Sequence, residues 1–228
     1  MAYTPIDNSA EHFKAVKYTG NGSEPRNIDV GFQSDFVWVK DRTVAYHHRL
    51  FDSTRGGAPI HSNTNGAQDS NNDGPELDFS SPYSNGFKII DNPDGTTNSY
   101  GVNVNNSEMI SWNWKFNGGT TSTNTSGSVN STVQVNSDAG MSIVKFTGNS
   151  SSDLTVGHGL GAAPHMIILK PYTVTEEWTV FHKKMGNNRF MFLNDDDGQS
   201  SEYSGYWGTP SSTTFGVKGG VYANNVNS

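Results

Sequence analysis

The sequence predicts an all-β protein made of two tandem antiparallel β-sandwich lobes. Its strand-like segments are short and are separated by Gly, Asn and Pro turns, which is typical of sandwiches. No segment shows a convincing amphipathic helical period. A pattern in residues 13–40 recurs in residues 141–170: an alternating strand, Thr-Gly-Asn, Val-Gly and an apolar run that ends in Lys. This internal repeat indicates that the two lobes share one architecture.

Polar uncharged residues dominate the composition, and this restricts the classes of partner. Of the 228 residues, 32% are hydrophobic and 16% are charged, and the formal net charge is −7. Binding to nucleic-acid phosphates or to anionic membranes needs clustered Lys and Arg, and the chain has no basic run. No apolar stretch approaches the roughly 20 residues that span a bilayer. We therefore expect neither a nucleic-acid partner nor membrane insertion.

The chain contains no cysteine. There can therefore be no disulfide framework, no thiolate nucleophile and no Cys-based zinc site. In a β-rich chain full of Asn, Ser and Thr, this indicates assembly in a reducing cytoplasm. The N-terminal residues have neither a positive region nor an apolar core, so we expect no signal peptide.

The first elements are an extended arm and two strands. Residues 1–11 have little apolar surface to bury and are expected to form the arm. Alternation over Phe13–Tyr18 predicts a strand that ends at a Gly-Asn-Gly turn. Phe36–Val39 is apolar at consecutive positions, which predicts a central strand with both faces covered. Met166–Leu169 is its counterpart in the second copy, with the same expectation.

The rest of the first lobe contains turns and two further strong strand signals. Asp52 is expected to accept from Arg55 in a self-bonded turn, and residues 61–75 to form a long surface loop. Asn85-Gly86 predicts a tight turn into a strand. In Met109–Phe116 every second residue is large and apolar, so one face was expected to supply much of the first core: Ile110, Trp112, Trp114 and Phe116.

A segment rich in Gly, Ser, Thr and Asn marks the boundary between the lobes. We expect four parts: an N-terminal arm at 1–11, a first sandwich at 12–117, a linker with a lead-in strand at 118–137 and a second sandwich at 138–228. Strands of the second lobe are expected at Trp178–Phe181, Phe190–Leu193 and Thr213–Val217.

The two copies do not end alike. Residues 101–106 are echoed by residues 220–225, but no equivalent of the strand Met109–Phe116 follows in the second copy. A sandwich that lacks one strand has unpaired backbone groups and an open apolar groove. We expect either that the sequence is cut short there, which is the favoured interpretation, or that a neighbouring chain supplies the strand.

One acidic loop has part of the spacing of a calcium site. Asp69, Asn71 and Asp73 place oxygens at the first, third and fifth positions, with Gly at the sixth. The twelfth position holds Ser80 and not an acid, so Glu76 would have to substitute. An ordinary solvated loop is the favoured interpretation, and calcium is the candidate cofactor that remains. Asp195–Gly198 is interpreted as a charged hairpin turn.

Several aromatic residues of the second lobe lie near expected loops. An exposed aromatic ring can stack on the C–H face of a sugar. The candidate glycan contacts are therefore Trp178, Tyr203, Tyr206, Trp207 and Tyr222, of which at least half are expected to be core residues instead. No pattern of catalytic residues is recognisable, so we expect no enzymatic activity.

The motifs of both copies together resemble a repeat family in virion proteins of tailed bacteriophages, marine ones in particular. Those proteins are described as tail-fibre-like or concanavalin-lectin-like. The motifs that carry the resemblance are Tyr18–Gly22, Gly31–Lys40, Asp52–Gly56, Ser84–Phe87, Trp112–Lys115 and Gly157–Gly161. The resemblance implies jelly-roll or lectin-like sandwiches and no catalytic residues.

The resemblance also implies a role in the virion, after assembly in the host cytoplasm. The first expectation is a tail or fibre component that contributes to host attachment, with other virion proteins, its own copies and a host surface glycan as partners. A homo-oligomer such as a trimer suits this reading. The alternatives are a capsid decoration or cement protein and the carbohydrate-binding module of a secreted protein.

Overall fold

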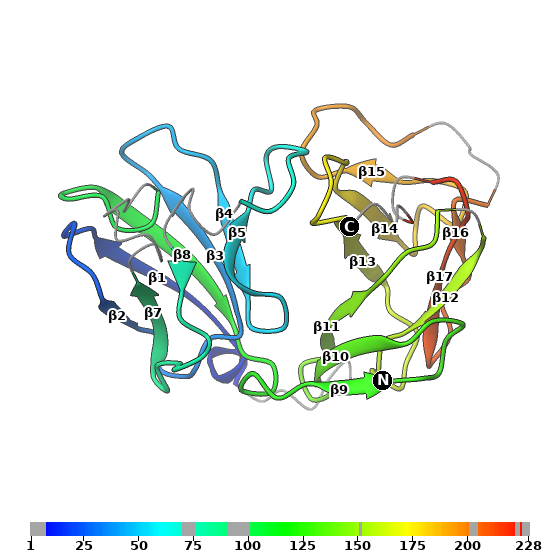
Figure 1. Ribbon diagram of the computed structural model, residues 1–228, viewed down its shortest axis with the longest axis horizontal. Helices are drawn as coiled ribbons and strands as arrows, with labels where there is room; N and C mark the ends of the chain where they lie inside the picture. Colours follow the sequence, from blue (N-terminus) through cyan, green and yellow to red (C-terminus); the bar gives the residue numbers. More distant parts are fainter. Residues whose placement is uncertain are drawn as a thin grey trace. The chain divides into compact units, whose positions relative to one another are not determined.

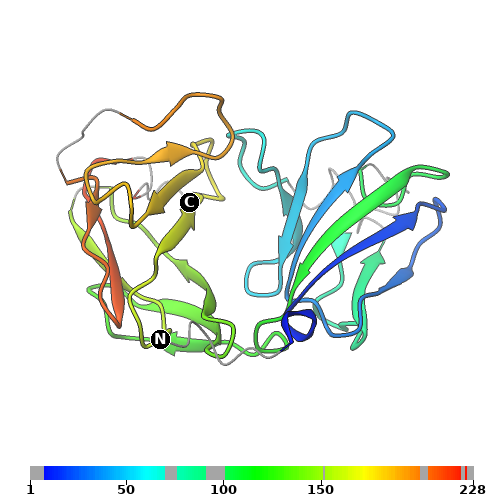
Figure 2. The ribbon, with the colours of Figure 1, turned by 180° about the vertical axis from the view of Figure 1, so that it is seen from behind.

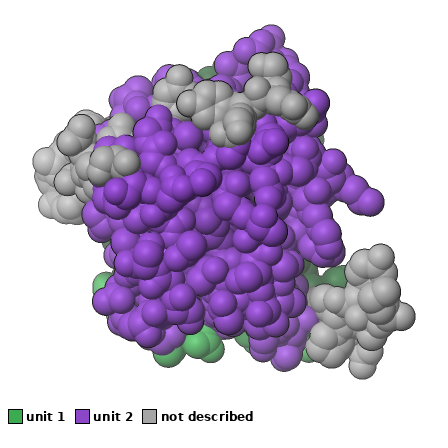
Figure 3. Space-filling model, turned by 90° about the vertical axis from the view of Figure 1, so that its right-hand side faces the viewer, with its two compact units in different colours: residues 1–61, 68–120 green, residues 62–67, 121–228 purple. Residues whose placement is uncertain are grey.

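The structure, a computed structural model, describes residues 8–69, 76–90, 101–150, 152–200, 205–221 and 224. It divides into two compact units, coloured separately in Figure 3. Unit 1 consists of residues 1–61 and 68–120, and unit 2 of residues 62–67 and 121–228. The described residues contain strands and one short 3-10 helix, η1 (Ser9–Glu11). None of their helices has the length and apolar character needed to cross a membrane. The expected all-β fold is therefore confirmed.

Unit 1 is a sandwich of two antiparallel sheets (Figures 1 and 2). The larger sheet has the order β1 (Phe13–Thr19), β8 (Glu108–Trp114), β3 (Phe36–Asp41), β4 (Arg49–Asp52), β5 (Gly56–Ile60). The smaller sheet has the order β2 (Arg26–Asp29), β7 (Gly86–Ile90), β6 (Glu76–Leu77).

One apolar core joins the two sheets of unit 1. Val37, Val39 and Phe51 come from the larger sheet, and Phe87 and Ile89 come from the smaller one. All five side chains are 2% exposed or less. The turn after β4 forms as expected, because the Asp52 carboxylate accepts from the backbone N–H of Arg55 (2.7 Å) and from its Nε (3.0 Å).

Strand β8 lies at the expected place, but its faces are reversed relative to the prediction. Met109, Ser111 and Asn113 are fully buried, and Ile110, Trp112 and Trp114 are half-buried on the opposite face. Small polar residues can face inward here because they hydrogen-bond one another: Asn113 Nδ2 donates to Ser111 Oγ (2.9 Å). The tryptophans therefore lie on the outer face of the sheet, and Phe116 lies beyond the end of β8.

Unit 2 contains three antiparallel sheets of three strands (Figures 1 and 2). Their orders are β13 (Met166–Leu169), β14 (Thr179–His182), β15 (Met191–Phe192); β12 (Leu154–Gly157), β17 (Thr214–Val217), β16 (Trp207–Gly208); and β11 (Met141–Phe146), β10 (Ser131–Asn136), β9 (Ser122–Asn124). Strands β9 and β10 lie where a linker with a lead-in strand was expected, and they are part of unit 2.

Strand β13 differs from its counterpart β3. Met166 is 54% exposed and Ile168 is 45% exposed. In the part of the chain that the structure describes, β13 pairs with β14 alone and is an edge strand. The expectation that Met166–Leu169 is a central strand with both faces covered is therefore wrong. Strand β3, for which a central position was also predicted, does lie between two other strands of its sheet.

In each unit a buried asparagine hydrogen-bonds a more exposed one, with nearly the same pattern of bonds. In unit 1 the Asn103 side chain accepts from Asn21 N (3.1 Å) and donates to the Asn21 side chain (3.1 Å). In unit 2 the Asn224 side chain accepts from Asn149 N (2.9 Å) and donates to the Asn149 side chain (3.4 Å). Both Asn103 and Asn224 are 0% exposed. This agreement supports the internal repeat, which stays a prediction.

The asparagine pairs also change the expected correspondence between the ends of the two copies. The sequence pattern placed Asn103 opposite Tyr222, whereas the hydrogen bonds place Asn224 in the role of Asn103. The shift is two residues along the chain. In both units the valine of the preceding Gly-Val pair is also buried in the core, as Val102 and Val221.

Replacing Asn103 by Ala should lower the free energy of unfolding by about 1–3 kcal/mol, because buried hydrogen-bonding groups lose their partners. Asn224→Ala should do the same in unit 2, where Ser152 O and Lys218 O lose a donor. Urea unfolding measures both effects. The exposed Asn105→Ala is the control, and an N103A variant as stable as N105A would contradict the prediction.

Candidate functional site

Five aromatic side chains cover the outer face of unit 1 across three neighbouring strands. We call them the aromatic face: Phe13 from β1, Trp112 and Trp114 from β8, and Phe36 and Trp38 from β3. Trp114 pairs with Phe13 on one side and with Phe36 on the other, and Trp112 pairs with Trp38. The register of the sheet thus places all five rings on one surface.

The rings of the aromatic face contact one another. The centroid of Trp114 lies 4.9 Å from that of Phe13 and 5.1 Å from that of Phe36. The centroids of Trp38 and Trp112 lie 5.9 Å apart at an interplanar angle of 66°. Phe13 is 37% exposed, and the other four are half-buried. Their mutual packing holds the rings in place while part of each remains open to a ligand.

A histidine extends the aromatic face beyond Trp38. Trp38 Nε1 donates to His48 Nδ1 (2.8 Å), and the two ring centroids lie 5.7 Å apart. Burial lowers the pKa of His48, and the positive charges of Lys40 and His47 lower it further. A lowered pKa favours the neutral imidazole, in which Nδ1 can accept the hydrogen bond from the indole N–H of Trp38.

The loop after β3 is fixed beside this face by Lys40. Its Nζ donates to the backbone oxygens of Asp41 (2.7 Å) and Tyr46 (2.8 Å). Lys170 ends the corresponding strand of unit 2 and donates to Asn65 O (2.9 Å) and Glu176 O (2.6 Å). Burial lowers the pKa of Lys170 to about 8, against the opposing effect of Glu176 and Glu177. Both lysines thus order a loop.

Buried polar groups support the aromatic face from inside. Ser34 Oγ donates to Asn113 Oδ1 (3.3 Å), and Asn113 Nδ2 donates to Lys14 O (3.1 Å). Asp35 is 0% exposed, and its carboxylate accepts from Phe116 N (2.7 Å), Gly118 N (3.0 Å) and Ser53 Oγ (3.3 Å). These bonds connect the start of β3 to the segment after β8.

The candidate calcium loop is only partly within the described residues. Asp69 Oδ2 contacts Arg49 Nη1 (3.1 Å) and His61 Nε2 (3.4 Å). One oxygen of the carboxylate is therefore already engaged within unit 1. Asn71 and Asp73 lie outside the described residues, as does the side chain of Glu76, which begins β6. Asp69 is therefore assigned to an ion pair of unit 1.

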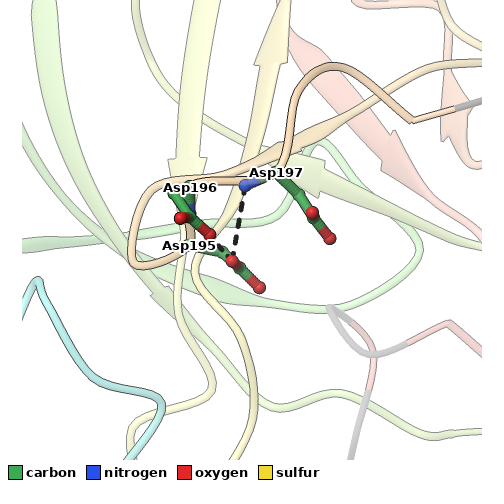
Figure 4. A group of neighbouring side chains, drawn as sticks. All are labelled: Asp195, Asp196 and Asp197. Atoms are coloured by element: carbon green, nitrogen blue, oxygen red, sulfur yellow. Dashed lines mark hydrogen bonds between the residues drawn. The ribbon is translucent and has the colours of Figure 1, made fainter.

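The acidic run of unit 2 lies in an exposed bend after β15 and is not the expected hairpin turn, because no described strand that follows it pairs with β15. Figure 4 shows that Asp195 Oδ1 accepts from the backbone N–H groups of Asp196 (2.8 Å) and Asp197 (3.4 Å). Ligand atoms of the three carboxylates lie within 4.8 Å of one another, and all three residues are exposed. Exposed acidic turns of this kind are common without an ion, so the cluster is not assigned as a metal site.

Three of the five aromatic residues named from the sequence as candidate glycan contacts are buried. Trp178 is 5% exposed, and Tyr206 and Trp207 are each 2% exposed. Phe181 lies 5.7 Å from Trp207 and Phe190 lies 4.2 Å from Tyr206, measured between ring centroids. These three rings are core residues, in agreement with the expectation that at least half of the candidates belong to the core. Two further candidates lie outside the described residues: Tyr203 and Tyr222.

The aromatic face was missed because its tryptophans were assigned to the core. Period-two alternation shows that two faces exist, but it does not say which one points inward. The alternation of Ser111 and Asn113 with the tryptophans was the sequence feature that could have indicated the orientation. Small polar residues on one face of a strand can point inward when they hydrogen-bond one another.

The charge on Asp35 should make the stability of unit 1 depend on pH. Burial raises the pKa of this carboxyl above its ordinary value, against the hydrogen bonds from Phe116, Gly118, Gly119 and Ser53. A raised pKa in the folded state gives stability that is present below about pH 4 and lost as the pH rises through the folded pKa. Wild type should therefore lose stability relative to Asp35→Asn as the pH rises.

Urea unfolding of both proteins between about pH 3 and pH 7 measures this difference, because the other titrating groups contribute equally to wild type and variant. A difference in unfolding free energy that stays constant, or that grows with pH in favour of wild type, would contradict the assignment.

Comparison with known proteins gives one family and no individual relative. No curated protein and no solved structure matches the chain. A family model described as "Domain of unknown function (DUF7483)" matches residues 8–228. Because this match includes both units, the chain belongs to the DUF7483 family.

Proposed function

We propose that this protein is a non-enzymatic structural component of a tailed-phage virion, carried on the tail or fibre, that contributes to host attachment by binding a surface glycan. The observation that supports the proposal is the aromatic face of unit 1. The resemblance of the motifs to phage virion repeats supplies the biological setting, and the aromatic face supplies a surface on which a ligand can lie.

Sugars suit this surface because their rings have one or two apolar C–H faces. Aromatic pairs contribute about 0.5–1.5 kcal/mol beyond the free energy of burying their apolar area. We expect a similar contribution to the binding free energy from each ring that packs flat against a sugar. Five rings in two rows offer room for more than one sugar unit. On β1 the exposed Lys17 lies on the same side as Phe13, where it can donate to hydroxyl groups.

A single aromatic face is expected to bind a glycan weakly, and several copies of the chain on one particle raise the overall affinity. When identical sites are held together on one particle, the second binding event becomes intramolecular and the overall affinity can rise by a factor of 10² to 10⁴. An oligomer on a fibre therefore needs only weak contacts per chain. The rigid sheet beneath the rings contributes by removing the entropy cost of ordering the site.

A second candidate function is capsid decoration or cement. The exposed edge strand β13, with Met166 and Ile168 on its surface, favours it because such edges hold neighbouring subunits. A carbohydrate-binding module of a secreted protein would use the same aromatic face.

Two binding experiments distinguish attachment from decoration. Binding of isolated virions to a glycan indicates the attachment role, and binding of the chain to assembled capsids indicates decoration.

Removing the most exposed ring should weaken glycan binding. Phe13→Ala deletes a side chain that is 37% exposed and makes a tilted ring contact with Trp114, so we expect about three- to tenfold weaker binding to host-derived polysaccharide. Calorimetry or a glycan array measures the change. Trp112→Ala should have at least as large an effect.

Trp178→Phe is the matched control, because Trp178 is buried in unit 2. It should leave the affinity unchanged. Unfolding curves confirm that each variant is folded. If no host polysaccharide binds the wild type, or if F13A and W112A bind as tightly as W178F does, the proposed attachment role of this face is wrong.

A further inference from the structure

The aromatic face of unit 1 ends in a row of positively charged side chains. Lys17 of β1 and Lys40 of β3 both pair with Ile110 of β8, one step along the sheet from Trp112. A step of two residues along a strand is about 7 Å and keeps the side chains on the same side of the sheet. Arg42 follows β3 by one residue. We call Lys17, Lys40 and Arg42 the cationic end of the aromatic face.

A cavity of about 120 Å³ lies at the cationic end. Residues from β1, from β8 and from just beyond β3 line it: Lys17, Tyr18, Thr19, Arg42, Glu108 and Met109. Pockets that enclose a whole drug-sized ligand measure roughly 300 Å³ or more. This smaller cavity therefore suits one substituent of a sugar, such as a carboxylate, while the rest of the glycan lies on the sheet.

Two of the cations at this end have N–H donors to offer to a ligand. Lys17 is exposed, and among the described residues its side chain has no hydrogen-bond or ion-pair partner. Arg42 Nη1 contacts Glu108 Oε2 (2.9 Å), which uses one of the five N–H donors of the guanidinium. Lys40 differs, because its Nζ already donates to backbone oxygens of the following loop. It therefore contributes charge, and the donors come from Lys17 and Arg42.

The local charge at the cationic end is opposite in sign to that of the whole chain, whose formal net charge is −7. Glu108 is the one carboxylate among the residues that line the cavity. Asp41 lies on the inner face of β3, is 1% exposed and accepts from the backbone N–H groups of Thr43 (2.8 Å) and Val44 (2.9 Å). Three cations thus face one exposed carboxylate, and this surface attracts an anion.

Trp112 is placed to hold the sugar that carries such an anion. Its neighbour on β3 is Trp38, whereas its neighbour on β1 is the small, exposed Ala15. No large side chain of β1 therefore covers Trp112 on that side. Lys17 lies one step further along β1 on the same face, so the flexible lysine side chain can reach a substituent of a sugar that packs on Trp112.

We propose that the glycan bound by the aromatic face is an acidic one, whose carboxylate or sulfate group binds at the cationic end to Lys17 and Arg42. This inference rests on the proposed glycan-binding function and specifies the class of ligand. The aromatic rings contact the apolar C–H faces that neutral and acidic sugars share. The charged N–H donors distinguish the two classes, because charge-assisted hydrogen bonds are stronger than neutral ones.

Four hexasaccharides test the selectivity by calorimetry. The acidic probes are hexamers of galacturonic acid and of sulfated galactose, and their neutral counterparts are the methyl ester and the unsulfated hexamer. At least one acidic probe should bind about three- to tenfold more tightly than its neutral counterpart at low ionic strength. This difference should shrink at about 0.5 M salt, because salt screens exposed charges. The acidic probe that shows the difference identifies carboxylate or sulfate as the preferred group.

Two variants of opposite sign test the position of the anion. Lys17→Gln removes a positive charge and keeps an N–H donor, so the ratio of acidic to neutral affinity should fall about two- to fivefold. Glu108→Gln removes the negative charge beside Arg42, so the same ratio should rise. A loss of structure cannot produce this rise. Lys184→Gln, at an exposed position of unit 2, changes the net charge as Lys17→Gln does and should leave the ratio unchanged.

Equal affinity for acidic and neutral hexamers, with binding of both weakened in Trp112→Ala, would overturn this inference and leave the glycan role of the aromatic face intact. A ratio in Lys17→Gln and Glu108→Gln that equals the ratio in Lys184→Gln would also overturn it. Failure of all four hexamers to bind would overturn it as well, whereas the attachment role is judged separately by binding of host polysaccharide.

Discussion

Strand β8 is the central strand on which the larger sheet of unit 1 depends. An inner strand needs hydrogen-bonding partners on both of its edges. This strand pairs along its whole length with β1 and along nearly all of it with β3. Backbone groups that are removed from water without a partner cost free energy, so a central strand cannot be lost without exposing two neighbours. Among the described strands of unit 2, β11 and β13 are each paired on one edge only.

The position of β8 also decides what lies on each face of the sheet. Its inner face carries Ser111 and Asn113, whose polar atoms are satisfied by each other, by Ser34 and by Lys14 O. A buried amide is tolerated only when its hydrogen bonds are made inside the protein. With the inner face given to these groups, Trp112 and Trp114 are left for the outer face, where they form the aromatic face.

Much of the fold was predictable from apolar runs. The strands around Phe36–Val39, Phe87–Ile90 and Thr214–Val217 were expected within one or two residues of their observed bounds, because consecutive or alternating apolar residues define them locally. Short strands such as β6 and β16 were missed. They contain two residues each, and their conformation is imposed by the neighbouring strand and not by their own sequence.

The site was less predictable, for two physical reasons. The burial of Trp178 and Tyr206 depends on what packs against them, and in a chain with few apolar residues the large rings are needed to fill the core of unit 2. The orientation of Trp112 depends on which face of β8 has its hydrogen bonds satisfied. The burial of Trp178 and Tyr206 depends on residues distant in the sequence, and the orientation of Trp112 is indicated only by the small polar Ser111 and Asn113 on the opposite face of its own strand.

The two units, which the sequence predicts to be copies of one repeat, share one anchor and differ in their outer layers. Asn103 and Asn224 accept from the backbone N–H groups of Asn21 and Asn149 at similar distances. The outer face carries aromatic rings on paired strands in unit 1, and Met166 and Ile168 on an edge strand in unit 2. Rings on strands that are paired on both edges lie on a rigid surface. The outer residues can therefore differ between the units while the asparagine anchor stays the same, and a ligand surface on unit 1 does not imply one on unit 2.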